Sequence, residues 1–123
     1  MTVTSLFPIL STPDLPRLLG FYERALGASV TYRFEDGGRD VYVALGIGGG
    51  AMGIGEDTKI PAASSDDRIV LWFYVDDVDA AFAAAREAGA VSDHEPTDMP
   101  WGERVARVRD LDGNLLNLGA AAG

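Results

Sequence analysis

The sequence predicts an α+β protein built from two βαβββ modules, and three observations support this fold class. The order strand, helix and three strands occurs twice along the chain. The two helical patterns end at Gly27 and Gly89, which occupy corresponding places in the repeat. A polar stretch rich in Pro and Ser, at about 56–67, separates the halves. A four-stranded sheet covered by one helix leaves its other face bare, so two such sheets could enclose a cavity.

The first module is expected over about residues 1–56, and it begins with a strand at 3–10. Leucines and Tyr22 then recur from Leu15 to Leu26 at the spacing of one helix face. Asp14 is expected to cap this helix, and Gly27 is expected to end it. The three strands that follow are predicted at 29–35, 40–46 and 51–55.

The second module is expected over about residues 68–119, within a single domain of residues 1–123. Residues 68–75 (RIVLWFYV) form the strongest strand signal in the chain. Asp76 or Asp77 is expected to cap a helix whose buried face is mostly alanine. The remaining strands are predicted near 91–96, 103–109 and 114–119, with a turn at 110–113 and a frayed GAAAG end.

Composition limits the function. The chain has 123 residues, of which 47% are hydrophobic, enough for one domain with its own core. Its formal net charge of −9 argues against nucleic-acid binding and mildly favours a cationic ligand. No apolar run is long enough to cross a membrane and no leader pattern is visible, so a cytoplasmic protein without membrane contact is expected.

The chain has no Cys and a single His, which restricts its chemistry further. Thiol nucleophiles are excluded, and so is a metal site that needs two His from one chain. His94 has acidic neighbours and could act as a general base, but a solvated surface His is the favoured interpretation. The glycines at 48–53 match G-x-G-x-x-G, yet no helix follows, so a glycine-rich hairpin is expected instead of a phosphate site.

Four short motifs span nearly the whole chain, in this order: Thr12-Pro13-Asp14-Leu15 with Gly20–Gly27, then Val75–Ala81, then Pro100–Arg104, then Asp110–Asn114. They resemble the signatures of the vicinal oxygen chelate superfamily, which includes glyoxalase I, extradiol dioxygenases and bleomycin-resistance proteins. The resemblance implies paired βαβββ modules that form curved sheets around a concave cavity. It also implies a homodimer, because members often build the cavity across two subunits.

The metal-binding members of this superfamily carry ligands on the first and last strands of each module. The resemblance places these positions on Phe7, Val70, Asn117 and the region of Met52 or Gly53. Phe and Val offer no donor atom, and an Asn carbonyl is a poor single ligand for a transition metal. The sequence therefore predicts neither a metal site nor another cofactor.

Apolar and aromatic side chains stand where the metal ligands would be, which suggests a pocket for a flat organic ligand. Strand alternation separates Leu71 and Phe73 from Trp72 and Tyr74, and the resemblance turns the second pair toward the cavity. Core packing or a dimer interface remains the alternative for the aromatic residues. The candidate ligand-binding residues are Phe7, Phe34, Tyr42, Met52, Trp72, Tyr74, Trp101 and Asn117.

Arg107 and Arg109 share one face of the strand at 103–109. Either could bind a ligand carboxylate, but offsetting nearby acids is the favoured role.

These observations predict a non-catalytic protein that confers antibiotic resistance by sequestering a large, partly planar natural product. The candidate ligands are bleomycin-type, enediyne or mitomycin-like compounds. One alternative is a metal-dependent lyase, isomerase or dioxygenase of the same superfamily, for which the ligands are missing. Another is a metal-free enzyme or a metabolite-sensing domain that uses the same pocket.

Overall fold

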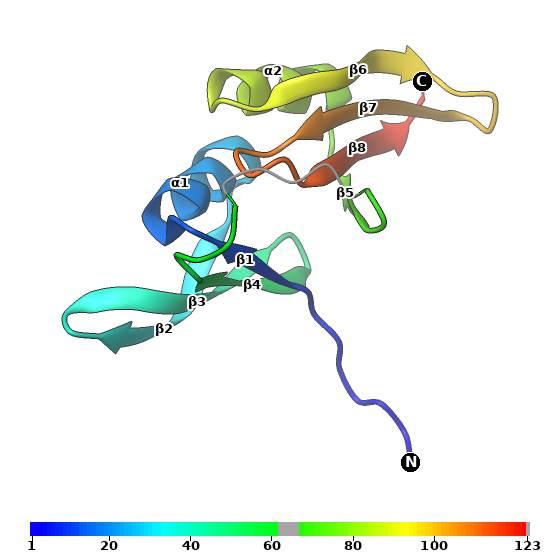
Figure 1. Ribbon diagram of the computed structural model, residues 1–123. Coiled ribbons are helices and arrows are strands. Elements are labelled where there is room, and N and C mark those ends of the chain that lie inside the picture. Colours follow the sequence, from blue (N-terminus) through cyan, green and yellow to red (C-terminus); the bar gives the residue numbers. More distant parts are fainter. Residues whose placement is uncertain (62–66, 123) are drawn as a thin grey trace.

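A computed structural model describes residues 1–61 and 67–122, which form two four-stranded mixed sheets and two helices (Figure 1). In the first sheet the strand order is β1-β4-β3-β2, with β1 parallel to β4 and the other pairs antiparallel. Its strands are β1 (Ile9–Thr12), β2 (Ser29–Asp36), β3 (Arg39–Ile47) and β4 (Gly50–Glu56).

The second sheet repeats this topology. Its order is β5-β8-β7-β6, again with one parallel pair, β5 with β8. The strands are β5 (Val70–Tyr74), β6 (Val91–Asp98), β7 (Glu103–Arg109) and β8 (Leu115–Ala121). The predicted α+β fold of two βαβββ modules is confirmed.

Each helix begins at the Asp that the sequence suggests. Asp14 Oδ1 accepts a hydrogen bond from Arg17 N (3.2 Å) at the start of α1 (Leu15–Leu26). Asp77 Oδ1 accepts one from Ala80 N (3.1 Å) at the start of α2 (Val78–Glu87). Both carboxylates satisfy backbone N–H groups that the first helical turn leaves without partners. Gly27 ends α1 with φ 67°, a conformation that glycine adopts without steric cost.

The helices lie on one face of each sheet and pack against each other. Helix α1 covers β3 and β4, whereas α2 covers β6, β7 and β8. One continuous core joins α1, β3, β4 and the helix-facing side of β7 and β8. The opposite face of each sheet, called here its open face, points away from the helices, and large apolar side chains on it are exposed.

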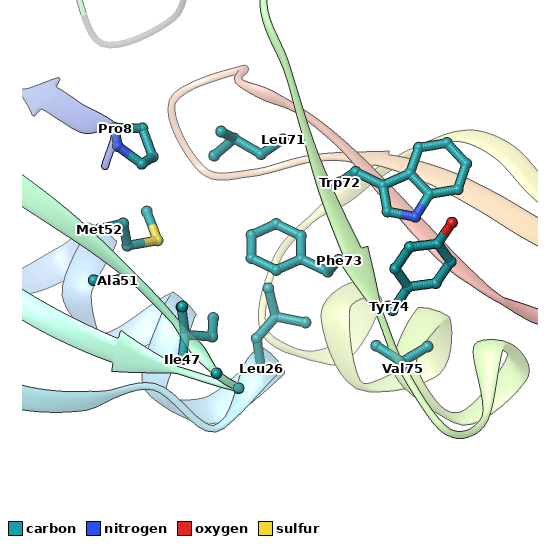
Figure 2. Close-up of a pocket in the computed structure, with 13 residues that line it drawn as sticks. Pro8, Leu26, Ile47, Ala51, Met52, Leu71, Trp72, Phe73, Tyr74 and Val75 are labelled. Atoms are coloured by element: carbon teal, nitrogen blue, oxygen red, sulfur yellow. The ribbon is translucent and has the colours of Figure 1, made fainter. Parts of the chain in front are cut away.

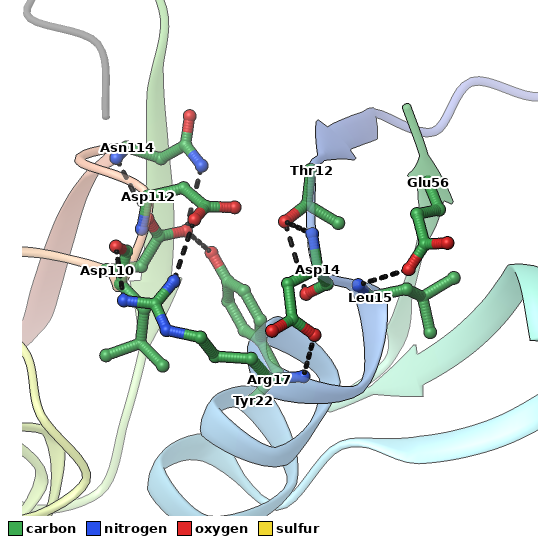
Figure 3. A network of polar contacts seen from close by, with 10 residues as sticks. Thr12, Asp14, Leu15, Arg17, Tyr22, Glu56, Asp110, Asp112 and Asn114 are labelled. Atoms are coloured by element: carbon green, nitrogen blue, oxygen red, sulfur yellow. Dashed lines mark hydrogen bonds and ion pairs between the residues drawn. The ribbon is translucent and has the colours of Figure 1, made fainter. Parts of the chain in front are cut away.

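A buried polar cluster links α1 to the turn between β7 and β8 (Figure 3). The Tyr22 hydroxyl donates to Asp110 Oδ2 (2.7 Å), and Asp110 Oδ1 accepts from the backbone N of Asp112 and Asn114. Arg17 Nη1 donates to Asp112 Oδ1 (3.1 Å). The other Asp112 oxygen is buried without a partner among the described residues, and burial raises the pKa of this carboxyl. The cluster thus holds the two modules together through side chains of both.

The first and the last strand differ from the sequence predictions. The strand expected at 3–10 begins only at Ile9, because β4 pairs with β1 from Gly53 onward and Pro8 has no N–H to donate. The residues before Pro8 instead run away from the body of the molecule (Figure 1). The last strand extends to Ala121, paired with Glu103, where a frayed end was expected.

The linker expected at 56–67 is described only in part. Glu56 belongs to β4, and its Oε2 accepts a hydrogen bond from Leu15 N (3.0 Å) at the start of α1. Residues 62–66 of the expected linker lie outside the described residues. Within the described part of the chain, neither helix is long and apolar enough to cross a lipid bilayer.

Candidate ligand-binding site

Strand β5 divides its side chains between the core and the open face of the second sheet. Leu71 and Phe73 pack against the core, whereas Trp72 and Tyr74 remain 41% and 71% exposed. This division follows from the period of two along a strand. Ile69, which the alternation groups with Leu71 and Phe73, precedes the strand and is exposed.

A glycine allows Trp72 to lie against the second sheet. A Cβ placed on Gly119 would come within 2.8 Å of the Trp72 indole, a separation that would force the ring to move. The two residues lie on the neighbouring strands β5 and β8. The indole therefore rests on a flat patch of backbone and keeps much of its surface free for stacking.

Glu103 contacts two further aromatic residues, Trp101 and Tyr74, at this end of the open face. Trp101 Nε1 donates to Glu103 Oε1 (2.7 Å). A hydrogen bond to the same carboxylate raises the pKa of the Tyr74 phenol. The Tyr74 ring lies 5.7 Å from that of Trp72, centre to centre. Three of the predicted ligand-binding residues, Trp72, Tyr74 and Trp101, thus form one aromatic cluster. Glu103 holds two of them together, and the sequence analysis did not identify it.

The open face of the first sheet uses a similar arrangement without charged partners. The Tyr42 ring covers Gly53, where a Cβ would come within 2.8 Å of its Cε1 atom. Phe34 pairs with Tyr42 across β2 and β3, and the Tyr32 ring lies 6.4 Å from the Tyr42 ring. Phe7, just before β1, is half-exposed. Tyr32 was not among the predicted residues, although its alternation with Phe34 was visible in the sequence.

A groove between the modules brings three predicted residues together (Figure 2). It has a volume of about 460 Å³ and runs between β5 and the β3–β4 turn, with Met52, Trp72 and Tyr74 in its lining. A second hollow of about 720 Å³ lies between β1 and β5 and shares Pro8 and Leu71 with the first. Both volumes are in the range of sites for drug-sized ligands.

Met52 occupies a different place from the one predicted for it. Its side chain is 2% exposed and belongs to the core, on the helix-facing side of β4. It borders the groove from within the protein and does not lie on an open face with Tyr42 or Trp72. Neighbouring Gly53 takes the open-face position, which the sequence alternatives had left undecided.

The residues at the metal-ligand positions do not fit a metal ion. Phe7 and Val70 have no donor atoms, and Asn117 Oδ1 already accepts a hydrogen bond from Arg107 Nε (2.9 Å). Among residues 1–61 and 67–122, no group of three His, Cys, Asp or Glu is placed to hold a metal. His94 is exposed and its Nδ1 lies 2.8 Å from the Glu95 carbonyl oxygen, which agrees with a surface role.

The arginines of β7 differ in their partners. Arg104 contacts Asp79 and Asp98, and Arg109 contacts Asp67 through both carboxylate oxygens. These contacts hold the pKa of Asp79 and of Asp67 below the usual value. The prediction that arginines here offset nearby acids is confirmed for Arg109. For Arg107, the partner in the described structure is the neutral amide of Asn117.

Paired βαβββ modules with uncovered aromatic faces define a class of two-module proteins, and the comparisons identify the family. The profile of the Glyoxalase/Bleomycin resistance protein/Dioxygenase superfamily matches residues 4–118. The chain belongs to this superfamily, as its motifs suggested.

Individual relatives share this fold at modest identity. The uncharacterized protein YraH of Bacillus subtilis is 28% identical, and the match covers 85% of this chain and 88% of YraH. The crystal structure of TioX from Micromonospora sp. ML1 has a TM-score of 0.77 at 26% identity, with 95% of this chain and 98% of TioX covered. A protein of unknown function from Agrobacterium tumefaciens has a TM-score of 0.72 at 27% identity, over 98% of this chain and 96% of its own.

Proposed function

We propose that this protein is a non-catalytic binder that confers antibiotic resistance by sequestering a large, partly planar natural product. Bleomycin-type, enediyne and mitomycin-like compounds are the candidate ligands. The observation that carries the proposal is the aromatic open face of the second sheet, where Trp72, Tyr74 and Trp101 lie exposed and the first two line a drug-sized groove. Because sequestration protects a cell only where the drug would meet its target, the proposal places the protein in the cytoplasm.

The side chains at the family's ligand positions support binding over metal chemistry. Phe7 and Val70 can contribute only apolar surface, and Asn117 can contribute an amide. Exposed aromatic rings on a rigid sheet offer stacking area with little conformational freedom to lose on binding. Because these positions carry neither a nucleophile nor a metal-binding side chain, they favour retention of an intact ligand.

The proposal includes a homodimer in which a second copy covers the open faces. Both faces carry exposed apolar side chains, and patches of this kind on a soluble domain mark binding or assembly sites. The exposed residues include Ile9, Tyr32, Phe34, Val70 and Trp72. Light scattering coupled to size exclusion is expected to give twice the chain mass, and a monomer at micromolar concentration would contradict this part.

Titration by tryptophan fluorescence tests the binding itself. A compound that stacks on Trp72 is expected to quench the emission of the protein in the micromolar range. The variant Trp72→Leu is expected to lose most of the affinity. Because the chain has only two Trp, at 72 and 101, the emission that remains in this variant reports on Trp101 alone. Absence of quenching across the three drug classes would refute the proposal.

Two further measurements separate binding from catalysis. Drug recovered from the complex is expected to be chemically intact, and an altered product would favour an enzyme. Elemental analysis of the purified protein is expected to show no stoichiometric divalent metal. About one tightly held metal per chain would instead favour the lyase, isomerase or dioxygenase alternative.

A further inference from the structure

Three arginines on one strand have different surroundings, and the difference concerns the open face. Arg104 and Arg109 each contact carboxylates. Arg107 has no salt bridge among the described residues, although the chain carries a formal charge of −9. Arg24, Arg68 and Arg86 also lack a salt bridge among these residues, but they are exposed, whereas Arg107 is half-buried.

Asn117 positions Arg107 by accepting a hydrogen bond from one of the five N–H groups of the guanidinium. The bond from Arg107 Nε to Asn117 Oδ1 is 2.9 Å long, and Asn117 itself is only 6% exposed. A guanidinium held at Nε keeps both terminal nitrogens available. Two parallel N–H groups match the two oxygens of a carboxylate, so this end suits bidentate recognition.

Trp72 lies in the same cross-strand row of the second sheet as Asn117 and Arg107. Trp72 pairs with Asn117 across β5 and β8, and Asn117 pairs with Arg107 across β8 and β7. Residues directly opposite one another project from the same face of a sheet. With strands spaced about 4.8 Å apart, the Cα atoms of Trp72 and Arg107 are about 10 Å apart. A bicyclic ring on Trp72 with an acidic substituent could span this distance.

The acids near Arg107 already have other partners. Asp67 places both carboxylate oxygens on Arg109, and Asp93 lies 3.5 Å from the same guanidinium. Glu103 accepts from Trp101. The titratable group opposite Arg107 on β6 is His94. An anionic ligand would contact Arg107 at hydrogen-bond distance. Its repulsion by the net negative charge of the chain is weaker, because salt screens charges beyond about 10 Å.

We propose that Arg107, held by Asn117, binds an anionic group of the ligand that stacks on Trp72. This inference rests on the proposed function and narrows its ligand class to planar aromatic compounds that carry a carboxylate or a similar anion. It replaces the preference for cationic ligands that the net charge suggested.

Calorimetric titration with two matched probes, 2-naphthoate and 2-naphthamide, tests the inference. The probes share one ring system and differ in charge. The wild-type protein is expected to bind the acid at least about tenfold more tightly, which corresponds to about 1.4 kcal/mol. Arg107→Met is expected to abolish this preference, and Arg107→Lys is expected to retain part of it because the charge remains without the fork.

Arg104→Met is the matched control, because it removes the same charge from the same strand. Arg104 contacts Asp79 of α2, on the helix-facing side, so the preference for the acid is expected to persist. Asn117→Leu is expected to weaken the preference without removing the guanidinium, and the circular dichroism of each variant checks its fold. Equal affinity of the wild type for both probes would overturn the inference, as would equal losses in the two Arg→Met variants.

The outcomes separate this inference from the proposed function. If Trp72→Leu weakens both probes and the acid is not preferred, the aromatic site stands and the anion site fails. If Arg107→Met removes the preference for the acid and Trp72→Leu leaves the affinity of both probes unchanged, the anion site stands without stacking. Failure of 2-naphthoate to bind at millimolar concentration would overturn the anion site, while the drug titrations described above decide the proposed function independently.

Discussion

The two modules share a backbone topology but differ in how many large side chains their helices bury and in the polarity of their open faces. Helix α1 buries five large side chains, Leu15, Leu18, Leu19, Phe21 and Tyr22, whereas α2 buries only Val78 and Ala85. The open faces of the two sheets also differ in polarity. The first sheet presents Tyr32, Phe34 and Tyr42, and the second adds Glu103, Arg107 and Asn117 to its aromatic rings.

This contrast shows that a repeated fold need not repeat its chemistry. Both sheets use a glycine beneath an aromatic ring, Gly53 under Tyr42 and Gly119 under Trp72. Among the described residues, the second sheet has the amide of Asn117 in the same cross-strand row as its ring. Module one therefore contributes most to the core, and module two has the more polar open face.

The largest expected difference between the modules is in stability. Phe21→Ala, in α1, removes a fully buried ring and is expected to cost about 3–5 kcal/mol of unfolding free energy. Phe82→Ala, in α2, is the matched control: its ring is only partly buried, so the cost should be clearly smaller. Urea unfolding of both variants measures the difference. Equal losses would show that the two helices contribute alike.

The glycines under the rings provide the next comparison. Gly119→Ala would displace the Trp72 indole and is expected to weaken aromatic ligands by about tenfold, which corresponds to about 1.4 kcal/mol. It should also shift the tryptophan emission spectrum. Gly53→Ala displaces Tyr42 instead and is expected to leave that spectrum unchanged. An identical response of the two variants would contradict separate roles for the two open faces.

The smallest effect is expected where the modules meet. Burial raises the pKa of Asp112 in the folded protein above its unfolded value, so its ionisation lowers stability as pH rises through that window. Asp112→Asn removes this penalty. Its stability relative to wild type should therefore be greater at pH 7 than at pH 3.5.

Urea unfolding at the two pH values measures this effect. The exposed carboxylates Asp67 and Asp79 have lowered pKa values and act in the opposite direction, because their stabilisation is lost as pH falls. They are present in both proteins and cancel in the difference. A relative stability that stays constant or worsens toward pH 7 would contradict a raised pKa at Asp112.

Local patterns predicted most of the fold. The caps at Asp14 and Asp77, the end of α1 at Gly27 and the alternation along β5 depend on residues close in sequence, and the structure has all of them. Predictions failed where a distant partner decides. Residues 3–7 have the apolar character of a strand, but the pairing with β4 does not extend to them, so β1 begins at Ile9.

The candidate site was predictable in composition more than in arrangement. The sequence singled out Trp72, Tyr74 and Trp101, but it could not show that Glu103 links two of them. Met52 was assigned to the pocket, and it borders the groove, but the sequence did not show that its side chain lies in the core. Which side of a short glycine-rich strand faces inward depends on the register with β3, and no local pattern specifies that register.

By itself, the sequence determined the two-module plan, the positions of the helices and the absence of metal-binding side chains at the family's ligand positions. The first two features follow from periodicity and capping, which act over a few residues, and the ligand positions follow from the resemblance to the family. The tertiary structure alone decided which of the three β7 arginines lacks an acidic partner among the described residues and which glycines lie beneath rings. Those relations join neighbouring strands that are far apart along the chain, and only strand pairing brings their side chains into contact.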